Sequence, residues 1–173
     1  MKNILKRSLS SNQIDLIMEE KKRVRWTKEE DVLIFMANFV SSLNSRDAEC
    51  ILSFDEMKVQ SVMEYDPSLD EVVGPHNYLQ VVMARGLFKN WKQPIYIGFD
   101  KKMTKEIMKN IIIKLHEKGI NVVGIVSDNC YSNVSCWREL GAHDFTKPYF
   151  EHPVTKKSIY VFPDAPHLLK LMR

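Results

Sequence analysis

One apolar segment, Asn121 to Ser127 (NVVGIVS), constrains the fold of this chain more than any other feature. It contains no charged residue, which is typical of a strand at the centre of a sheet. The stretch before it runs from Thr104 to Gly119, and its large apolar side chains recur on one stripe at helical spacing. A helix that leads into a central strand indicates an α/β fold with a crossover connection.

The segments on either side extend this pattern. Before residue 100 the sequence indicates a run of adjacent strands, for which antiparallel pairing is expected. These strand segments are 49–60, 61–65, 78–88 and 95–99. The later segments are a short helix over 133–140 closed by Gly141, an irregular stretch over 145–153, a strand over 158–162 and a last helix that starts within 163–167. Strands first and crossovers later predict a mixed sheet with flanking helices.

The chain before residue 48 divides into two parts. Residues 1–25 have few apolar side chains and predict a flexible tail that ends in a basic cluster. This cluster is a nuclear-import signal, a phosphate contact or a solvated run, and its candidate DNA-contacting residues are Lys21, Lys22, Arg23 and Arg25. Residues 26–47 contain a capping box and an apolar face that predict a helix over 28–43. This helix is either a remnant of a helical DNA-binding region or an element that packs on the domain over 48–173.

Composition narrows the class of protein. The 173 residues are 45% hydrophobic, which suits one domain with a sizeable core. A net charge of +3 neither requires nor excludes a nucleic-acid partner. The sequence has no apolar run near the roughly 20 residues of a membrane helix, no apolar stretch of a signal peptide and no zinc-ligand spacing among its three cysteines. We therefore expect a soluble intracellular domain with reduced thiols and no membrane partner.

Two aspartates stand out because of their places in apolar strands. Asp55 lies inside the first strand segment, and Asp128 directly follows NVVGIVS. A carboxylate in such a place is costly to bury without a partner, and Mg²⁺ is a natural partner because it prefers hard oxygen ligands. If the two strands are neighbours, both carboxylates reach one site suited to metal-dependent phosphoryl transfer. The alternative is that Asp128 is the N-cap of the next helix and that Asp55 faces solvent on an edge strand.

Several blocks of sequence resemble, in the same order, the RNase H-like catalytic domain of P-element-type DNA transposases, including relatives that carry a THAP domain. The blocks are CILSFDEMK over 50–58, RGLFKNWKQP over 85–94, GIVSD over 124–128, WRELG over 137–141 and FPDAPHLLK over 162–170. The match runs from about residue 48 to the C-terminus. The ordered set is specific, although no single block is.

The resemblance implies an RNase H-like α/β fold and a role for each matching acid. Asp55 takes the position of the first catalytic acid and Asp128 that of the second, and these two would hold Mg²⁺. Asp164 and His167 match the D-x-x-H element that the family places after the fifth strand, near the active site. The family cleaves and transfers DNA strands in the nucleus, with water and then a DNA 3′-hydroxyl as the attacking group.

Three features of the family are missing from this sequence. The third catalytic acid, a glutamate, and the guanine-nucleotide-binding insertion both lie downstream of the D-x-x-H element, and no cysteine precedes Cys50 to form an N-terminal zinc finger. Glu106 is no substitute for the glutamate, because an acid in the first turn of a helix is explained by the helix dipole. We therefore expect a domain truncated at its C-terminus, with little or no transposition of its own and no GTP site. The alternative is a domesticated or decayed transposon fragment that binds DNA or protein without catalysis.

The shortened end also has a consequence for packing. Only Ala165 to Arg173 remains after the last strand, so part of one sheet face is expected to stay open to water. Either the helix over 28–43 covers that face, or the protein associates with a partner or with itself. We expect partial cover by that helix together with self-association. DNA binding is expected to be weak and independent of sequence, with full-length transposase as a further partner.

Overall fold

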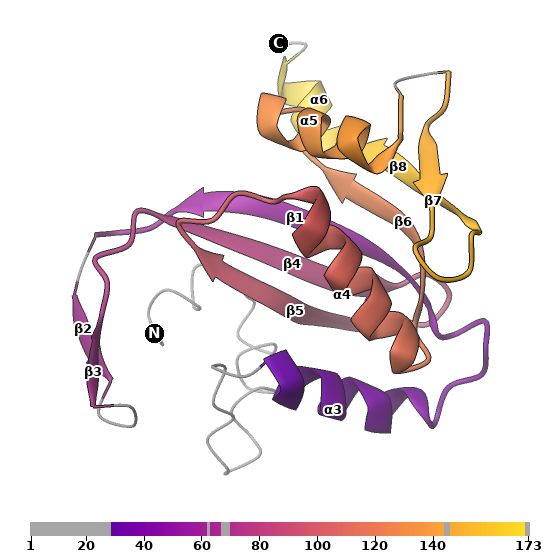
Figure 1. The fold of residues 1–173 in the computed structure, drawn as a ribbon, viewed down its shortest axis with the longest axis horizontal. Helices are drawn as coiled ribbons and strands as arrows, with labels where there is room; N and C mark the ends of the chain where they lie inside the picture. The colour runs from indigo at the N-terminus through magenta and orange to yellow at the C-terminus, as the bar shows by residue number, and fades with distance from the viewer. Residues whose placement is uncertain (1–28, 62, 67–69, 144–145, 172–173) are drawn as a thin grey trace.

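In the computed structural model, which describes residues 29–61, 63–66, 70–143 and 146–171, a six-stranded mixed sheet forms the centre of the protein (Figure 1). Across the sheet the strands lie in the order β5-β4-β1-β6-β8-β7. Their bounds are β1 Glu49–Lys58, β4 Tyr78–Gly86, β5 Lys92–Phe99, β6 Asn121–Ser127, β7 Tyr149–Glu151 and β8 Ser158–Pro163. The predicted mixed sheet is confirmed.

Strand direction changes in the middle of the sheet. β1, β4 and β5 pair antiparallel as successive strands, whereas β6 joins β1 in parallel and β8 joins β6 in parallel. The NVVGIVS segment forms β6 over its full predicted length and lies between β1 and β8. The central position explains its composition, because a strand with neighbours on both sides and helices over one face has little contact with water.

Four helices accompany the sheet among the described residues: α3 Glu29–Val40, α4 Lys105–Glu117, α5 Tyr131–Leu140 and α6 Ala165–Leu171. Thr104 caps α4 as predicted, since its hydroxyl accepts a hydrogen bond from the amide of Ile107 at 3.3 Å. Gly141 ends α5 at φ 105°, a left-handed conformation that glycine adopts without strain. None of these helices is long and apolar enough to cross a membrane.

One face of the sheet carries the hydrophobic core. Alternate residues of β1 point to this face, where Cys50, Leu52 and Phe54 are buried beneath α4. Helix α3 packs on the same face, because its Leu33 lines a small cavity of about 110 Å³ together with Ile95 of β5 and with residues of α4. In Figure 1, α4 crosses in front of the sheet, and α3 lies on the β5 side near the C-terminal end of α4.

The opposite face of β8 is open. Tyr160 and Phe162 keep 47% and 50% of their surface exposed, while the intervening Val161 is buried in the core. The predicted open apolar surface is therefore present. The expectation that the helix over 28–43 partly covers it is wrong, since α3 lies over β5 on the other face.

Short elements differ from the sequence-based expectation. The predicted strand over 61–65 is reduced to β2 (Glu64–Asp66), which pairs with β3 (Glu71–Val73) in a separate two-stranded sheet. The stretch over 145–153, predicted as irregular, contains the edge strand β7. Segments of three residues are too short to show a period in the sequence. The predicted tail over 1–25, with Lys21, Lys22, Arg23 and Arg25, lies outside the described residues.

Candidate active site

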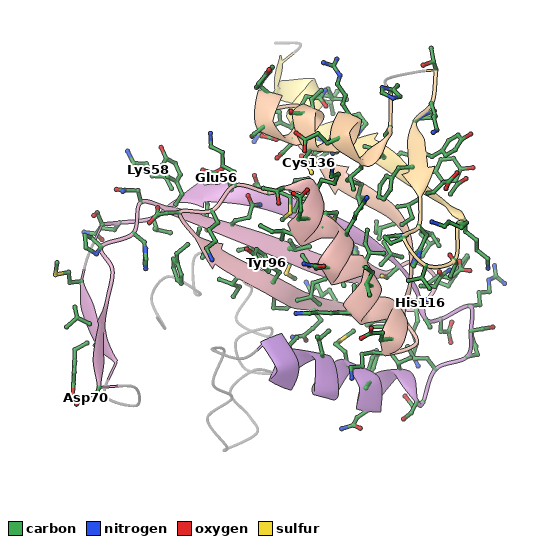
Figure 2. The ribbon with its side chains drawn as sticks, viewed as in Figure 1. Glu56, Lys58, Asp70, Tyr96, His116 and Cys136 are labelled. Atoms are coloured by element: carbon green, nitrogen blue, oxygen red, sulfur yellow. The ribbon has the colours of Figure 1, made fainter. Side chains whose placement is uncertain are left out.

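The pairing of β1 with β6 brings the two aspartates to one end of the sheet. Ser53 pairs with Val126, and the same register extended by two residues sets Asp55 beside Asp128. Both side chains line one cavity of about 460 Å³. β1 is an inner strand, so the edge-strand part of the alternative for Asp55 is wrong, but the Asp55 side chain is exposed, as that alternative predicted. Figure 2 shows Glu56, the residue after Asp55, near the C-terminal end of β1.

The electrostatic surroundings of Asp55 oppose its charged form. Neighbouring protein atoms partly desolvate the carboxylate and raise its pKa, and the negative charges of Asp128 and Asp164 raise it further. A hydrogen bond of 2.8 Å from the amide of Glu56, and the proximity of His167, lower the pKa but do not cancel the increase. Asp55 therefore lies among acids that repel it, an environment that a bound cation would relieve.

Asp128 is held in place by hydrogen bonds. Its Oδ1 accepts from the amide of Cys130 at 3.2 Å and from Nδ2 of Asn133 at 2.7 Å. Desolvation alone would raise the pKa of this carboxyl, but the thiol and amide of Cys130, the Asn133 amide and the nearby His167 together lower it. Asp128 stays charged and oriented as a result. The N-cap of α5 is Cys130 rather than Asp128, although the aspartate does accept a hydrogen bond from that residue.

The D-x-x-H element reaches the same end of the sheet. The amide of Asp164 donates to the carbonyl oxygen of Ser127 at 2.8 Å, which places Asp164 next to the end of β6, one residue before Asp128. The Asp164 carboxylate accepts from the amide of His167 at 3.3 Å, as a helix-capping side chain does. His167 lowers the pKa of both Asp55 and Asp128. The structure thus brings together the four residues singled out from the sequence.

A metal site at this position would rest on two carboxylates. Within the part of the chain that the structure describes, no group of three or more histidine, cysteine or acidic side chains is placed to hold a metal ion. Asp55 and Asp128 are hard oxygen donors of the type that Mg²⁺ prefers. Glu106 lies in the first turn of α4, where a hydrogen bond from its own amide is the main cause that lowers its pKa. This position agrees with the predicted structural role of Glu106.

Sequence reasoning missed several residues of the cavity. Asn133, the partner of Asp128, is buried on α5, and the cavity is also lined by Lys101 and Lys102 from the loop between β5 and α4. A signal for Asn133 was its place five residues after Asp128, within the first turn of the predicted helix. The two lysines carried no such signal, because only the strand order places the end of β5 near Asp55.

Comparison with known proteins points to one family. The family model described as "TNP-like, RNase H N-terminal domain" matches residues 28–141. The Transposable element P transposase of Drosophila melanogaster is 42% identical over 156 residues, which cover 86% of this chain and 21% of that protein. DNA transposase THAP9 of Homo sapiens is 26% identical over 147 residues, which cover 72% of this chain and 16% of that protein. The chain therefore spans about a fifth of the length of these curated relatives.

A solved structure gives the same result at the level of the fold. The Drosophila P element transposase strand transfer complex matches with a TM-score of 0.70 and 30% identity. The match covers 99% of this chain and 49% of the transposase chain. A likeness over nearly the whole chain means that the mixed sheet and its helices follow the arrangement found in that protein.

Proposed function

This chain belongs to the P element-type transposases and corresponds to the N-terminal part of their RNase H-like domain, and on that basis we propose that Asp55 and Asp128 form part of a metal-dependent site for cleaving and joining DNA strands. One observation supports this most directly. The register of β1 and β6, extended by two residues, pairs Asp55 with Asp128, both residues line one cavity, and desolvation together with the charge of Asp128 raises the pKa of Asp55.

The proposed metal is Mg²⁺, held by Asp55 and Asp128. When bound, it would supply Lewis-acid stabilisation of charge on the phosphate oxygens. The chain's own residues prepare the site for this ion. Asn133 and the amide of Cys130 fix the orientation of Asp128, and His167 offsets part of the repulsion between the acids. Asp164 sets the start of α6 and so holds His167 beside them.

We further propose that catalysis by this chain alone is weak or absent. Among the described residues no group of three or more histidine, cysteine or acidic side chains is placed to hold a metal ion, and a missing ligand costs both metal affinity and geometry. DNA remains the proposed partner, bound weakly and without sequence preference, and the nucleus is the proposed site of action. No guanine nucleotide is part of the proposal.

The metal proposal is tested by the thermal unfolding of the protein with and without Mg²⁺. If Mg²⁺ is present at ten times its dissociation constant, it should stabilise the native chain by about 1.4 kcal/mol, a rise in melting temperature of about 3–6 °C for a chain of this size. Asp55→Asn and Asp128→Asn should abolish the rise. Glu106→Gln is the matched control because it removes an acid outside the cavity. A rise that persists in Asp55→Asn contradicts the assignment.

Activity is tested separately by Mg²⁺-dependent nicking of supercoiled plasmid DNA. We expect little or no nicking by the wild-type chain and no difference from Asp55→Ala. Robust nicking that Asp55→Ala abolishes would show that the chain is an enzyme as it stands.

A second candidate function is a binding module without catalysis, derived from a transposase. Two observations favour it: the absence of a three-ligand metal group among the described residues, and the exposed Tyr160 and Phe162 on the open sheet face. An exposed apolar surface of this kind is typical of a contact with another protein or with a second copy. Under this reading Mg²⁺ leaves the melting temperature unchanged and self-association depends on the two aromatic residues.

A further inference from the structure

The cavity that contains the two aspartates is lined by side chains of both charges. Its acids are Asp55, Glu56, Asp100 and Asp128, and its basic side chains are Lys101 and Lys102. The lysines come from the loop between β5 and α4, two strands away from β1 in the sheet. Strands in a sheet are about 4.8 Å apart, so the end of β5 lies roughly 10 Å from the end of β1.

The backbone of the lysine loop is fixed at both ends. Before the lysines, the carboxylate of Asp100 accepts from the amides of Asn77 and Tyr78 at 2.9 Å each, and Nδ1 of His76 lies 2.9 Å from its other oxygen. After them, Met103 is buried with 4% exposure. These contacts fix the backbone on both sides of Lys101 and Lys102.

The two side chains are available for a ligand. Both lysines are exposed, and the ion pairs among the described residues, His76 with Asp100 and Lys105 with Glu106, do not involve them. The lysines are thus not present to neutralise the acids of the cavity by direct pairing. A phosphate group binds favourably to lysine side chains that line a cavity and form no ion pair within the protein.

An acid-lined cavity presents a problem for a DNA substrate. The carboxylates that would hold a metal also repel the phosphate backbone, so a strand near Asp55 needs positive charge on its flank. Phosphates follow one another by 3.4 Å of rise along one strand of B-DNA, so a separation of roughly 10 Å between strand ends corresponds to about three phosphates. The lysine loop is placed to meet the backbone a few nucleotides from the acids.

We propose that Lys101 and Lys102 bind the phosphate backbone of the DNA strand that lies over Asp55 and Asp128. This inference rests on the proposed function, since it assumes that DNA enters the cavity. It assigns to the loop between β5 and α4 the task of positioning the strand, in a chain whose basic segment over 21–25 was the sequence-based candidate for DNA contact.

The test is a binding titration of the 173-residue chain with a fluorescein-labelled DNA duplex, in EDTA, at several salt concentrations. The variant is Lys101→Ala with Lys102→Ala. Each lost phosphate contact lowers the salt slope of log K by about 0.9, so the double variant should lose nearly 2 from that slope. When the salt concentration rises from 50 to 200 mM, the variant should therefore lose about tenfold less DNA affinity than the wild type loses.

The matched control is Lys89→Ala with Lys92→Ala, which removes the same charge at the opposite end of β5. It should leave the salt slope close to that of the wild type. Equal slopes for both double variants, a larger effect of the control, or no binding by the wild-type chain at 20 mM salt would each overturn the proposal.

The titration also separates this proposal from the metal proposal. Because EDTA removes divalent ions, DNA binding is measured without any contribution from Mg²⁺. If the lysine pair controls the salt slope while Mg²⁺ fails to raise the melting temperature, the metal site alone is refuted. If Mg²⁺ stabilises the chain but the lysine variant keeps its slope, the lysine proposal alone is refuted.

Discussion

Asn133→Ala should destabilise the fold through a single hydrogen bond at the candidate site. The Asn133 side chain is 7% exposed, and its Nδ2 donates to the Asp128 carboxylate at 2.7 Å. A hydrogen bond to a charged group contributes about 1.5–3 kcal/mol. The remaining bond from the amide of Cys130 still holds Asp128, so we expect the lower half of that range, about 1.5–2 kcal/mol.

The loss is measured as the change in the free energy of unfolding in urea, with an unchanged dependence on denaturant. Tyr131→Ala is the control, since Tyr131 is 87% exposed in the same first turn of α5. The pH dependence has a defined sign. Asn133 helps to lower the pKa of Asp128, so its contribution is full above pH 3.8 and disappears as pH falls through the lower folded-state pKa. A loss below about 0.5 kcal/mol at pH 7 would refute the argument that Asn133 orients Asp128.

Three further predictions concern other parts of the protein. Gly141→Ala should lower the free energy of unfolding in urea by about 1–2 kcal/mol, because Gly141 has a left-handed backbone with φ of 105°. An added Cβ meets nothing within 4 Å, so no steric clash adds to this cost. An unchanged free energy of unfolding would contradict the prediction. Burial of the His152 ring, followed by the charges of His116 and Lys157, lowers the pKa of His152. The free energy of unfolding of the wild type should therefore fall as pH drops below 6.5 and then level off. Equal free energies of unfolding at pH 7.5 and pH 5.5 would disprove this prediction. Tyr160→Thr with Phe162→Thr should reduce self-association in sedimentation, since both side chains are exposed and threonine keeps β propensity; unchanged association would exclude this face.

The predictable parts of the fold are the elements in which an apolar pattern repeats over many residues or in which a capping residue marks the end. Helix α4 has one apolar stripe between a capping threonine and a left-handed glycine, and β6 is rich in apolar residues and has no charged one, so both were found with correct or nearly correct ends. The hairpin of β2 and β3 and the edge strand β7 have three residues each. Their pairing depends on neighbours that a local pattern does not contain.

Helix α3 shows a second limit of the sequence. Its apolar face was predicted, but the sheet face that it covers was not. The apolar face of an amphipathic helix shows that this face must be buried, but it does not show which element buries it. Contact with β5 and α4 decided the matter, and both lie more than 50 residues further along the chain.

The candidate site was predictable only in part, for the same reason. Asp55 and Asp128 were predictable as neighbours because each is fixed by a strand, and the parallel pairing of β1 with β6 carries their register to the sheet end. Asp128 as a structural anchor and Asp128 as a metal ligand were treated as competing interpretations, yet the hydrogen bonds to its Oδ1 are compatible with both. A ligand that is already oriented loses little further freedom when it binds an ion. If Asp128 holds Mg²⁺ as proposed, Asn133→Ala should weaken Mg²⁺ binding as well as folding.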